Sequence, residues 1–260
     1  MLKIEKFVTP SPEQWEIVIE GMRNPKNSWD RMDSFTCDEG YDECPENCPY
    51  DIKTCPVNGD FYDKFYIIGS NDHTLMTQLA YGGPVHAKYR RMIPVWITLT
   101  APLYFWKEFD TYKVGTVANS CSTMHKIQAK EFTIGDFSYE HLIKDWVGNN
   151  NDSIWYKDPP ENGPIKCQLM FTPLDALRIT IGVLNTNREA YLKTKNKKYW
   201  WQMIQLLPSS YNQKRTVMLN YEVLANIYKS RRNHKLDEWH TFCDWIERLP
   251  YSELITGEKK

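Results

Sequence analysis

Apolar and polar residues alternate at the start of the chain and then change to a helical spacing. Residues 2–8 alternate and predict a first strand. Ser11 suits a helix N-cap, Pro12 the first helical position and Gln14 the capping-box position, so a helix is predicted to begin here. The apolar face of this helix has helical spacing. It consists of Trp15, Val18, Ile19 and Met22.

Similar patterns continue along most of the chain. Residues 93–101 alternate and predict a second strand. Residues 75–80 have helical spacing before a stop at Gly82–Gly83, and residues 102–112 are predicted to return to helix. Further helices are predicted in the second half, over residues 172–191, 199–207, 220–232 and 236–249. Early strands followed by helices indicate an α+β fold.

Composition narrows the class of protein. The formal net charge of −1 gives no overall field that would attract nucleic acid or an anionic membrane. No apolar run approaches the length of a membrane span, and the first ten residues lack the apolar stretch of a signal peptide. We therefore expect a soluble, cytoplasmic protein. An aromatic content of 14% is typical of broad apolar contacts, including contacts between subunits.

Residues 24–63 lose the periodic pattern and are rich in acidic residues, Pro and Cys. Four thiols lie here at a spacing of C-x6-C-x3-C-x6-C: Cys37, Cys44, Cys48 and Cys55. Tetrahedral zinc accepts four thiolates and supplies folding energy to a segment without a core. An iron–sulfur cluster or four unrelated thiols are the alternatives, and zinc is preferred to the cluster. We predict one domain over residues 1–260, with a Cys-rich insertion at about 30–63.

A polar stretch, residues 109–127, follows a strongly apolar segment and has no helical or strand period. It is either a surface loop or a site for a polar ligand. Its hydroxyl groups and backbone can bind a phosphate or a base edge, and Lys113 can neutralise charge. Cys121 would be a nucleophile if Lys113 or His125 lowered its pKa. The alternative is an inert thiol in a loop.

Two further segments carry candidate ligands. Residues 229–235 (KSRRNHK) end a predicted helix, where basic side chains complement the helix dipole. Arg231 within this segment could instead grip a phosphate with two hydrogen bonds. His86 stands between a helix stop and a strand, and it is either a ligand or a packed histidine.

The order and spacing of these pieces resemble the flavin-dependent thymidylate synthase family, ThyX. The strongest match starts at Leu207-Pro208, passes Asn220 and reaches Arg231, with the family's spacing kept. The family's hallmark, Arg-His-Arg followed by spaced serines, corresponds to Thr111-Tyr112-Lys113 and then to Thr116, Asn119 and Ser122. The early Arg and Ser region corresponds to Arg23 and Ser28, and the family's final His before the strand to His86.

The resemblance implies a ThyX-like α+β fold, a homotetramer, FAD as cofactor and a pyrimidine nucleotide such as dUMP as substrate. In the family, reduced flavin supplies a hydride and folate supplies the one-carbon unit. The residues implied to hold the nucleotide are Lys113, Asn119, Ser122 and Arg231. Those implied to face the cofactor are His86, Tyr112 and Asn226.

The chain departs from the family at several charged positions. The hallmark arginines are replaced, and Glu222 stands where the family has another arginine. We expect Cys121 to compensate as a catalytic nucleophile, with Lys113 as its catalytic partner. The alternative function is a non-enzymatic, ThyX-like oligomeric binding protein with a zinc-stabilised lobe.

Overall fold

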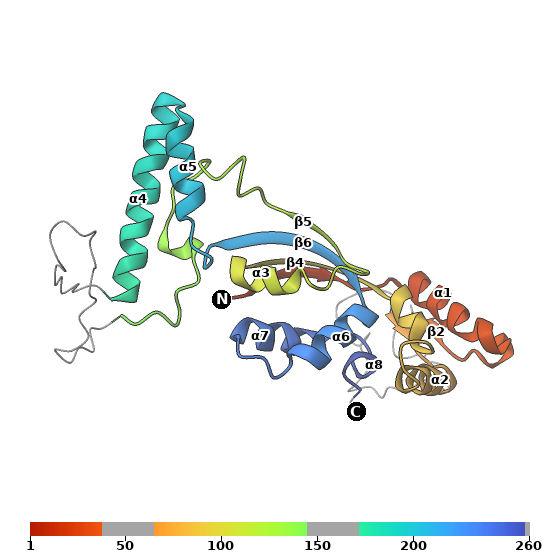
Figure 1. Cartoon of the computed structure of the whole chain (residues 1–260). Coiled ribbons are helices and arrows are strands. Elements are labelled where there is room, and N and C mark those ends of the chain that lie inside the picture. Colours follow the sequence, from red (N-terminus) through yellow and green to blue (C-terminus); the bar gives the residue numbers. More distant parts are fainter. Residues whose placement is uncertain (38–64, 145–171, 258–260) are drawn as a thin grey trace. The chain divides into compact units, whose positions relative to one another are not determined.

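The computed structural model describes residues 1–37, 65–144 and 172–257 of the chain (Figure 1). Two compact units can be distinguished, and each is described by itself. The sheet unit comprises Leu2–Thr100, Lys107–Ser120 and Lys214–Lys260. The hairpin unit comprises Met1, Ala101–Trp106 and Cys121–Gln213.

A four-stranded sheet forms the centre of the sheet unit. Its strand order is β1-β4-β6-β5. The strands are β1 (Lys3–Val8), β4 (Pro94–Pro102), β6 (Asn212–Asn220) and β5 (Val117–Ser120). β1 pairs antiparallel with β4, with Lys3 opposite Thr100, and β5 pairs antiparallel with β6, with Val117 opposite Met218. The β-strands predicted over residues 2–8 and 93–101 are confirmed.

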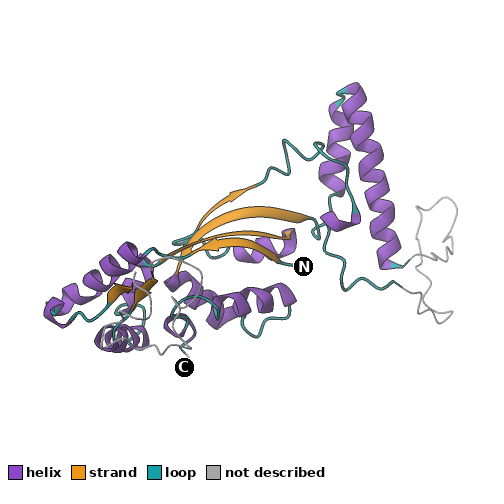
Figure 2. Cartoon of the chain, turned by 180° about the vertical axis from the view of Figure 1, so that it is seen from behind, coloured by secondary structure: helices purple, strands orange, loops and turns teal. Residues whose placement is uncertain are grey.

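Helices cover this sheet and enclose an aromatic core. They are α1 (Pro12–Arg23), α2 (Ser70–Tyr81), η4 (Ala87–Met92), α6 (Tyr221–Arg231), α7 (Asp237–Ile246) and α8 (Glu253–Thr256). α6 and α7 lie against one face of the sheet in both views (Figures 1 and 2). Trp239 of α7 is fully buried and stacks on Phe109, with ring centroids 6.2 Å apart. Burial of such large rings stabilises the unit.

A buried ion pair ties α1 to α2. Asp72 is fully buried and accepts a hydrogen bond from Nε of Arg23, which is 3% exposed. The same carboxylate accepts from the backbone N–H of Asp33 and Ser34 and from the Ser34 hydroxyl. These bonds satisfy the buried charge. They also position the residues just before β2 (Phe35–Cys37), which pairs with β3 (Phe65–Ile67) in a two-stranded sheet.

The hairpin unit is built on two long helices, α4 (Pro173–Thr194) and α5 (Lys197–Leu206). Thr172 and Asp175 form a capping box at the start of α4, and Lys195 adopts a left-handed conformation, φ 56°, at its end. The core of this unit is apolar. Its buried members are Ile127, Phe132, Phe137, Leu177, Leu184 and Met203.

Most elements of this fold agree with the patterns in the sequence. The predicted helix over 102–112 is present as α3 (Leu103–Phe109). The stretch over 109–127 was expected to lack strand structure, which is wrong, because β5 lies within it. Strand β6 was not predicted, since its middle is polar and only Gln213, Val217 and Leu219 are buried. The α+β class is confirmed, and the division into one domain with an insertion stays a prediction.

No helix in the described ranges is long and apolar enough to cross a membrane.

Replacement of Asp72 tests the buried ion pair. Asp72→Asn should lower the free energy of unfolding by about 3–5 kcal/mol, because it leaves the buried Arg23 guanidinium without a counter-charge. Urea denaturation followed by circular dichroism measures this. Glu16→Gln, an exposed change on α1, is the matched control and should leave stability nearly unchanged. Equal stability of the two variants would contradict the structural role given to this pair.

Candidate functional site

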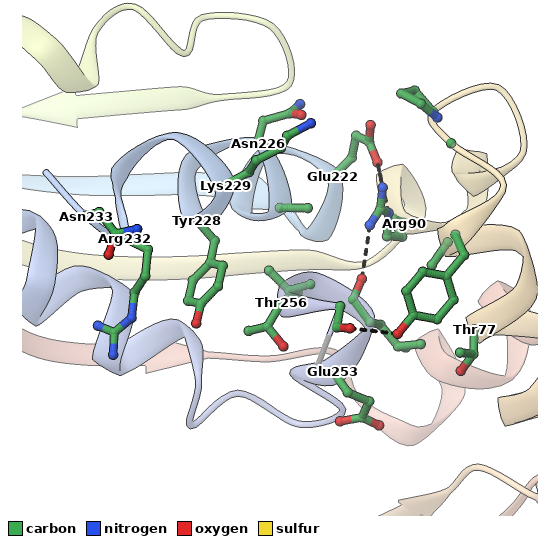
Figure 3. A pocket seen from close by; sticks show the side chains of 18 residues that line it. Thr77, Arg90, Glu222, Asn226, Tyr228, Lys229, Arg232, Asn233, Glu253 and Thr256 are labelled. Carbon is green, nitrogen blue, oxygen red and sulfur yellow. Dashed lines mark hydrogen bonds and ion pairs between the residues drawn. The ribbon is translucent and has the colours of Figure 1, made fainter. Parts of the chain in front are cut away.

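A polar pocket opens beside α6 in the sheet unit (Figure 3). Asn220 starts the helix by accepting a hydrogen bond from the N–H of Val223, at 3.0 Å. Successive turns of α6 then present Glu222, Asn226 and Lys229 to the pocket. The pocket has a volume of about 600 Å³, which suits a small-molecule ligand.

An ion pair between Arg90 and Glu222 fixes one side of this pocket. Nε of Arg90 donates to Oε2 of Glu222 at 2.9 Å, and Nη2 lies 2.8 Å from the same oxygen. Nη1 of Arg90 donates to the carbonyl of Leu254 at 3.1 Å, so the guanidinium joins η4, α6 and α8. Both side chains are largely buried, so removal of either one would leave the other buried with an unpaired charge.

The phenol of Tyr89 lies beside this pair. Burial raises the pKa of Tyr89 above its ordinary value, so the phenol stays neutral and donates to the carbonyl of Met76 at 2.8 Å. This bond holds η4 on α2, the helix that supplies the opposite wall of the pocket.

Three polar groups of the pocket have no partner among the described residues. The hydroxyl of Thr77 is buried without a hydrogen bond, which is an unfavourable arrangement for a polar atom. Asn226 and Lys229 are exposed, and no hydrogen bond or ion pair involves their side chains within the described ranges. The pocket therefore offers a hydroxyl, an amide and an ammonium group to a ligand.

Other charges of the pocket are already paired. Arg232 contacts Asp244 at 2.7 Å and Glu247 at 3.2 Å, and the hydrogen bond that it donates to Asp244 raises the pKa of the Arg232 guanidinium. Glu253 lies 2.8 Å from Nε2 of His73. These contacts position the C-terminal helices around the pocket.

Arg231, at the other end of α6, lies in a second polar cluster. Its Nη1 donates to Oε2 of Glu108 at 2.8 Å, and its Nε donates to the Tyr112 hydroxyl at 3.0 Å. The guanidinium carbon lies 4.9 Å from the centroid of the Trp239 ring, within the range of a cation–π contact. Trp239 Nε1 donates to the same oxygen of Glu108 at 2.8 Å.

These contacts hold Arg231 in one orientation and leave one nitrogen of its guanidinium available to a ligand. The side chain is 18% exposed, and its Nη2 has no partner in the described part of the chain. A ligand oxygen could therefore bind Nη2 without displacing Glu108. His234 is also near, with its Nε2 3.4 Å from Oε2 of Glu108.

The polar stretch over 109–127 approaches the start of α6. Gly115 has φ 79°, and a Cβ atom there would come within 3.0 Å of Nδ2 of Asn220. The positive φ and the close approach both favour glycine here, and a side chain would be strained. Lys113 is exposed just before it, and Asn119 is exposed on β5, opposite Thr216 of β6.

Two predicted site residues, Cys121 and Ser122, belong to the hairpin unit. Cys121 is exposed, and its carbonyl accepts a hydrogen bond from Nε2 of Gln213 at 3.0 Å. The hydroxyl of Ser122 accepts from the N–H of His125 at 2.9 Å. Both residues are accessible to a ligand.

The three predicted cofactor residues lie in different surroundings. Asn226 lines the pocket of Figure 3, and Tyr112 contacts Arg231. His86 is exposed and lines a smaller pocket of about 400 Å³ together with Val85 and Leu79. Their common role with the cofactor stays a prediction.

The predicted metal site lies mostly outside the described residues. Cys37 is buried on β2, opposite Phe65 of β3. Cys44, Cys48 and Cys55 belong to the residues that the structure does not describe. Within residues 1–37, 65–144 and 172–257, no three His, Cys, Asp or Glu side chains are grouped as a metal site would require.

Several residues that shape these sites were not predicted from the sequence: Thr77, Arg90, Glu108, Lys229 and Trp239. One signal was available. Glu222 replaces an arginine of the family, and a buried acid on a helix requires a cationic partner. Arg90 is that partner. Nothing in the sequence pattern distinguishes Glu108 from an ordinary exposed acid.

The α+β fold of the chain is similar to that of solved flavin-dependent thymidylate synthases. The chain is similar to ThyX from Helicobacter pylori, solved with FAD and dUMP, at a TM-score of 0.54 and 11% identity over 99% of this chain and 98% of that one. It is also similar to the UMP/dUMP methylase PolB from Streptomyces cacaoi, solved with 5-Br UMP, at a TM-score of 0.51 and 11% identity over 99% and 94%. The chain matches no protein-family model and no curated protein. At such low identity these likenesses establish the fold.

Thiol labelling tests the environments of the cysteines. Burial raises the pKa of Cys243 to about 11, so its thiolate fraction is small at pH 8 and rises only toward pH 11. Cys121 is exposed. Iodoacetamide at pH 8, followed by peptide mass spectrometry, should modify Cys121 well before Cys243. Denatured protein is the control, in which both should react. Equal rates in the folded protein would contradict this arrangement.

Proposed function

We propose that the protein is an enzyme that binds a pyrimidine nucleotide and modifies its base, as dUMP methylation or a related one-carbon transfer with FAD. The observation that carries this proposal is the fixed orientation of Arg231 on a fold shared with ThyX and with a UMP/dUMP methylase. Glu108 and Tyr112 hold the guanidinium while Nη2 stays available.

Arg231 is the proposed ligand of the nucleotide phosphate. An arginine held by a carboxylate and two aromatic rings loses little conformational freedom when it binds, which favours affinity. Glu108 neutralises part of the charge of Arg231. The site therefore suits a phosphate whose charge is also balanced by contacts with other groups. Lys113, Asn119 and Ser122 remain the proposed further nucleotide ligands, and all three are exposed.

The pocket beside α6 fits the polar part of a flavin cofactor. Its buried Thr77 hydroxyl lacks a partner in the described structure, and Asn226 and Lys229 offer an amide and a positive charge. Ribityl hydroxyls and a diphosphate would satisfy such groups. Reduced flavin supplies a hydride when bound. The chain's own residues bind and orient it, with Asn226 and Lys229 toward its polar part, and His86 and Tyr112 remain proposed cofactor contacts.

We also propose that the protein is a homo-oligomer, with a tetramer as the expected state. Exposed apolar side chains on α4 and α5 support contacts between subunits. They are Ile179, Val183, Leu192, Trp201 and Leu206.

The alternative function is a non-enzymatic oligomeric binding protein with a zinc-stabilised lobe. The replacement of the hallmark arginines by Thr111 and Lys113 favours it, as does the partial neutralisation of Arg231 by Glu108.

Replacement of Arg231 tests the phosphate role. Arg231→Lys should weaken dUMP binding by about 1.5–3 kcal/mol, the scale of a hydrogen bond to a charged group. A single ammonium group cannot contact Glu108, Tyr112 and a phosphate in the same geometry. Isothermal titration calorimetry measures the change, and Arg178→Lys on exposed α4 is the control. Unchanged affinity in Arg231→Lys would leave this arginine a purely structural role.

A covalent probe tests the proposed role of Cys121 as nucleophile. Its thiolate would add to C6 of the pyrimidine, forming an S–C6 bond while the electron pair of the C5–C6 double bond moves to C5. Incubation with 5-fluoro-dUMP and a folate one-carbon donor should then give an adduct at Cys121, detected by intact mass spectrometry. Cys121→Ser is the control. Normal turnover by Cys121→Ser, without any adduct in the wild type, would end this proposal.

Elemental analysis tests the zinc site proposed for Cys37, Cys44, Cys48 and Cys55. Protein purified without added metal should contain about one zinc per chain, as one tetrahedral site requires. Cys48→Ser should lower the zinc content, whereas Cys121→Ser should not. Zinc-free protein with four freely reactive thiols would exclude the site.

A further inference from the structure

A second polar pocket lies in the sheet unit, where α1 ends. It is formed by the last turn of α1, the short turns η1 (Asn24–Lys26) and η2 (Trp29–Arg31), and one side of α2. Its volume is about 510 Å³, within the range of small-molecule sites. It shares no lining residue with the pocket of Figure 3. Among the described residues, Leu75 is the single apolar one in its lining.

Arg23 lies at the floor of this pocket, because it belongs to the lining and is only 3% exposed. Its Nε donates to Asp72, and its Nη1 donates to the carbonyl and the hydroxyl of Ser28, both at 3.2 Å. Its Nη2 is buried and has no hydrogen-bond partner among the described residues. A buried guanidinium nitrogen without an acceptor is unfavourable, so an acceptor at this point would stabilise the structure.

Two further cations surround the opening. Lys26 and Arg31 are both exposed and line the pocket. Neither forms an ion pair within the described ranges. Asp30 is the one carboxylate that the described part of the chain contributes to the lining. Asp72 balances the charge of Arg23, so Lys26 and Arg31 against Asp30 leave the described lining a net positive charge of about one, which favours an anion.

We propose that this pocket binds the phosphate groups of a phosphorylated ligand, at a site separate from that of the proposed reaction. Phosphate has several acceptor oxygens in a tetrahedral arrangement, so donors can approach it from different sides. Arg23 contributes from the floor, while Lys26 and Arg31 contribute from the rim. A single carboxylate has only two oxygens and satisfies this set of donors less fully.

Calorimetric titration with inorganic pyrophosphate tests this proposal. The wild-type protein should bind pyrophosphate saturably. The double variant Lys26→Gln/Arg31→Gln removes two rim charges without touching the buried Arg23–Asp72 pair. It should weaken binding by about tenfold or more, since each lost charge was a hydrogen-bond donor to the ligand. Arg178→Gln/Lys193→Gln removes the same charge from α4, and it should bind as the wild type does.

The outcomes distinguish this site from the nucleotide site. The variants Arg231→Lys and Asn226→Ala/Lys229→Gln alter the two other proposed phosphate sites. Both should keep the pyrophosphate binding that Lys26→Gln/Arg31→Gln weakens. Titration of Asn226→Ala/Lys229→Gln with ADP, in which the proposed FAD pocket is impaired, identifies the source of the phosphate. Tighter binding than pyrophosphate indicates a nucleotide, and equal binding indicates the phosphate groups alone. Absence of saturable binding by the wild type would overturn the proposal. An equal loss in the two double variants would do the same, because it would reflect net charge and not this pocket.

Discussion

The ion pair between Arg90 and Glu222 is the contact on which the arrangement around α6 depends. It is largely buried, and the same guanidinium reaches the carbonyl of Leu254 in α8. A buried pair of this kind stabilises the fold little relative to apolar packing. It does specify how the helices are positioned, because any other arrangement leaves a charge unpaired. We regard this specificity as the reason that η4, α6 and α8 meet at one pocket.

Helix α6 then connects two sites through its own geometry. Its start carries Glu222 and, a turn later, Asn226, which face the pocket. Its end carries Arg231, which Glu108 and Trp239 surround. The pocket follows the helix from Glu222 to Lys229, and Arg231 comes only two residues after Lys229. A rigid helix thus fixes the distance between the proposed cofactor and phosphate groups.

Local pattern was enough to predict much of this fold. The capping box at Ser11, the alternation over residues 93–101 and the helices around Val223 and Trp239 all follow from short-range rules, and the structure contains them. Strand β6 escaped prediction because burial by neighbouring strands, and not alternation, makes it a strand.

The site was harder to predict than the fold. Arg231 was identified from its spacing to Asn220, yet its partner Glu108 lies 123 residues earlier, and no periodicity links the two. The same holds for Arg90 and Glu222, which are 132 residues apart. Long-range polar pairs are set by tertiary packing, so sequence reasoning finds one member and misses the other. The Cys-rich segment, in contrast, depends on residues outside the described structure.

Titration of the purified protein with FAD tests the central claim most directly. The account predicts a saturable change in the flavin absorption spectrum, because the pocket beside α6 removes the cofactor from water. Asn226→Ala/Lys229→Gln should weaken this binding, while Arg178→Gln/Lys193→Gln on α4 should not. A spectrum of FAD that is unchanged at any concentration of the wild-type protein would contradict the account and favour the non-enzymatic alternative.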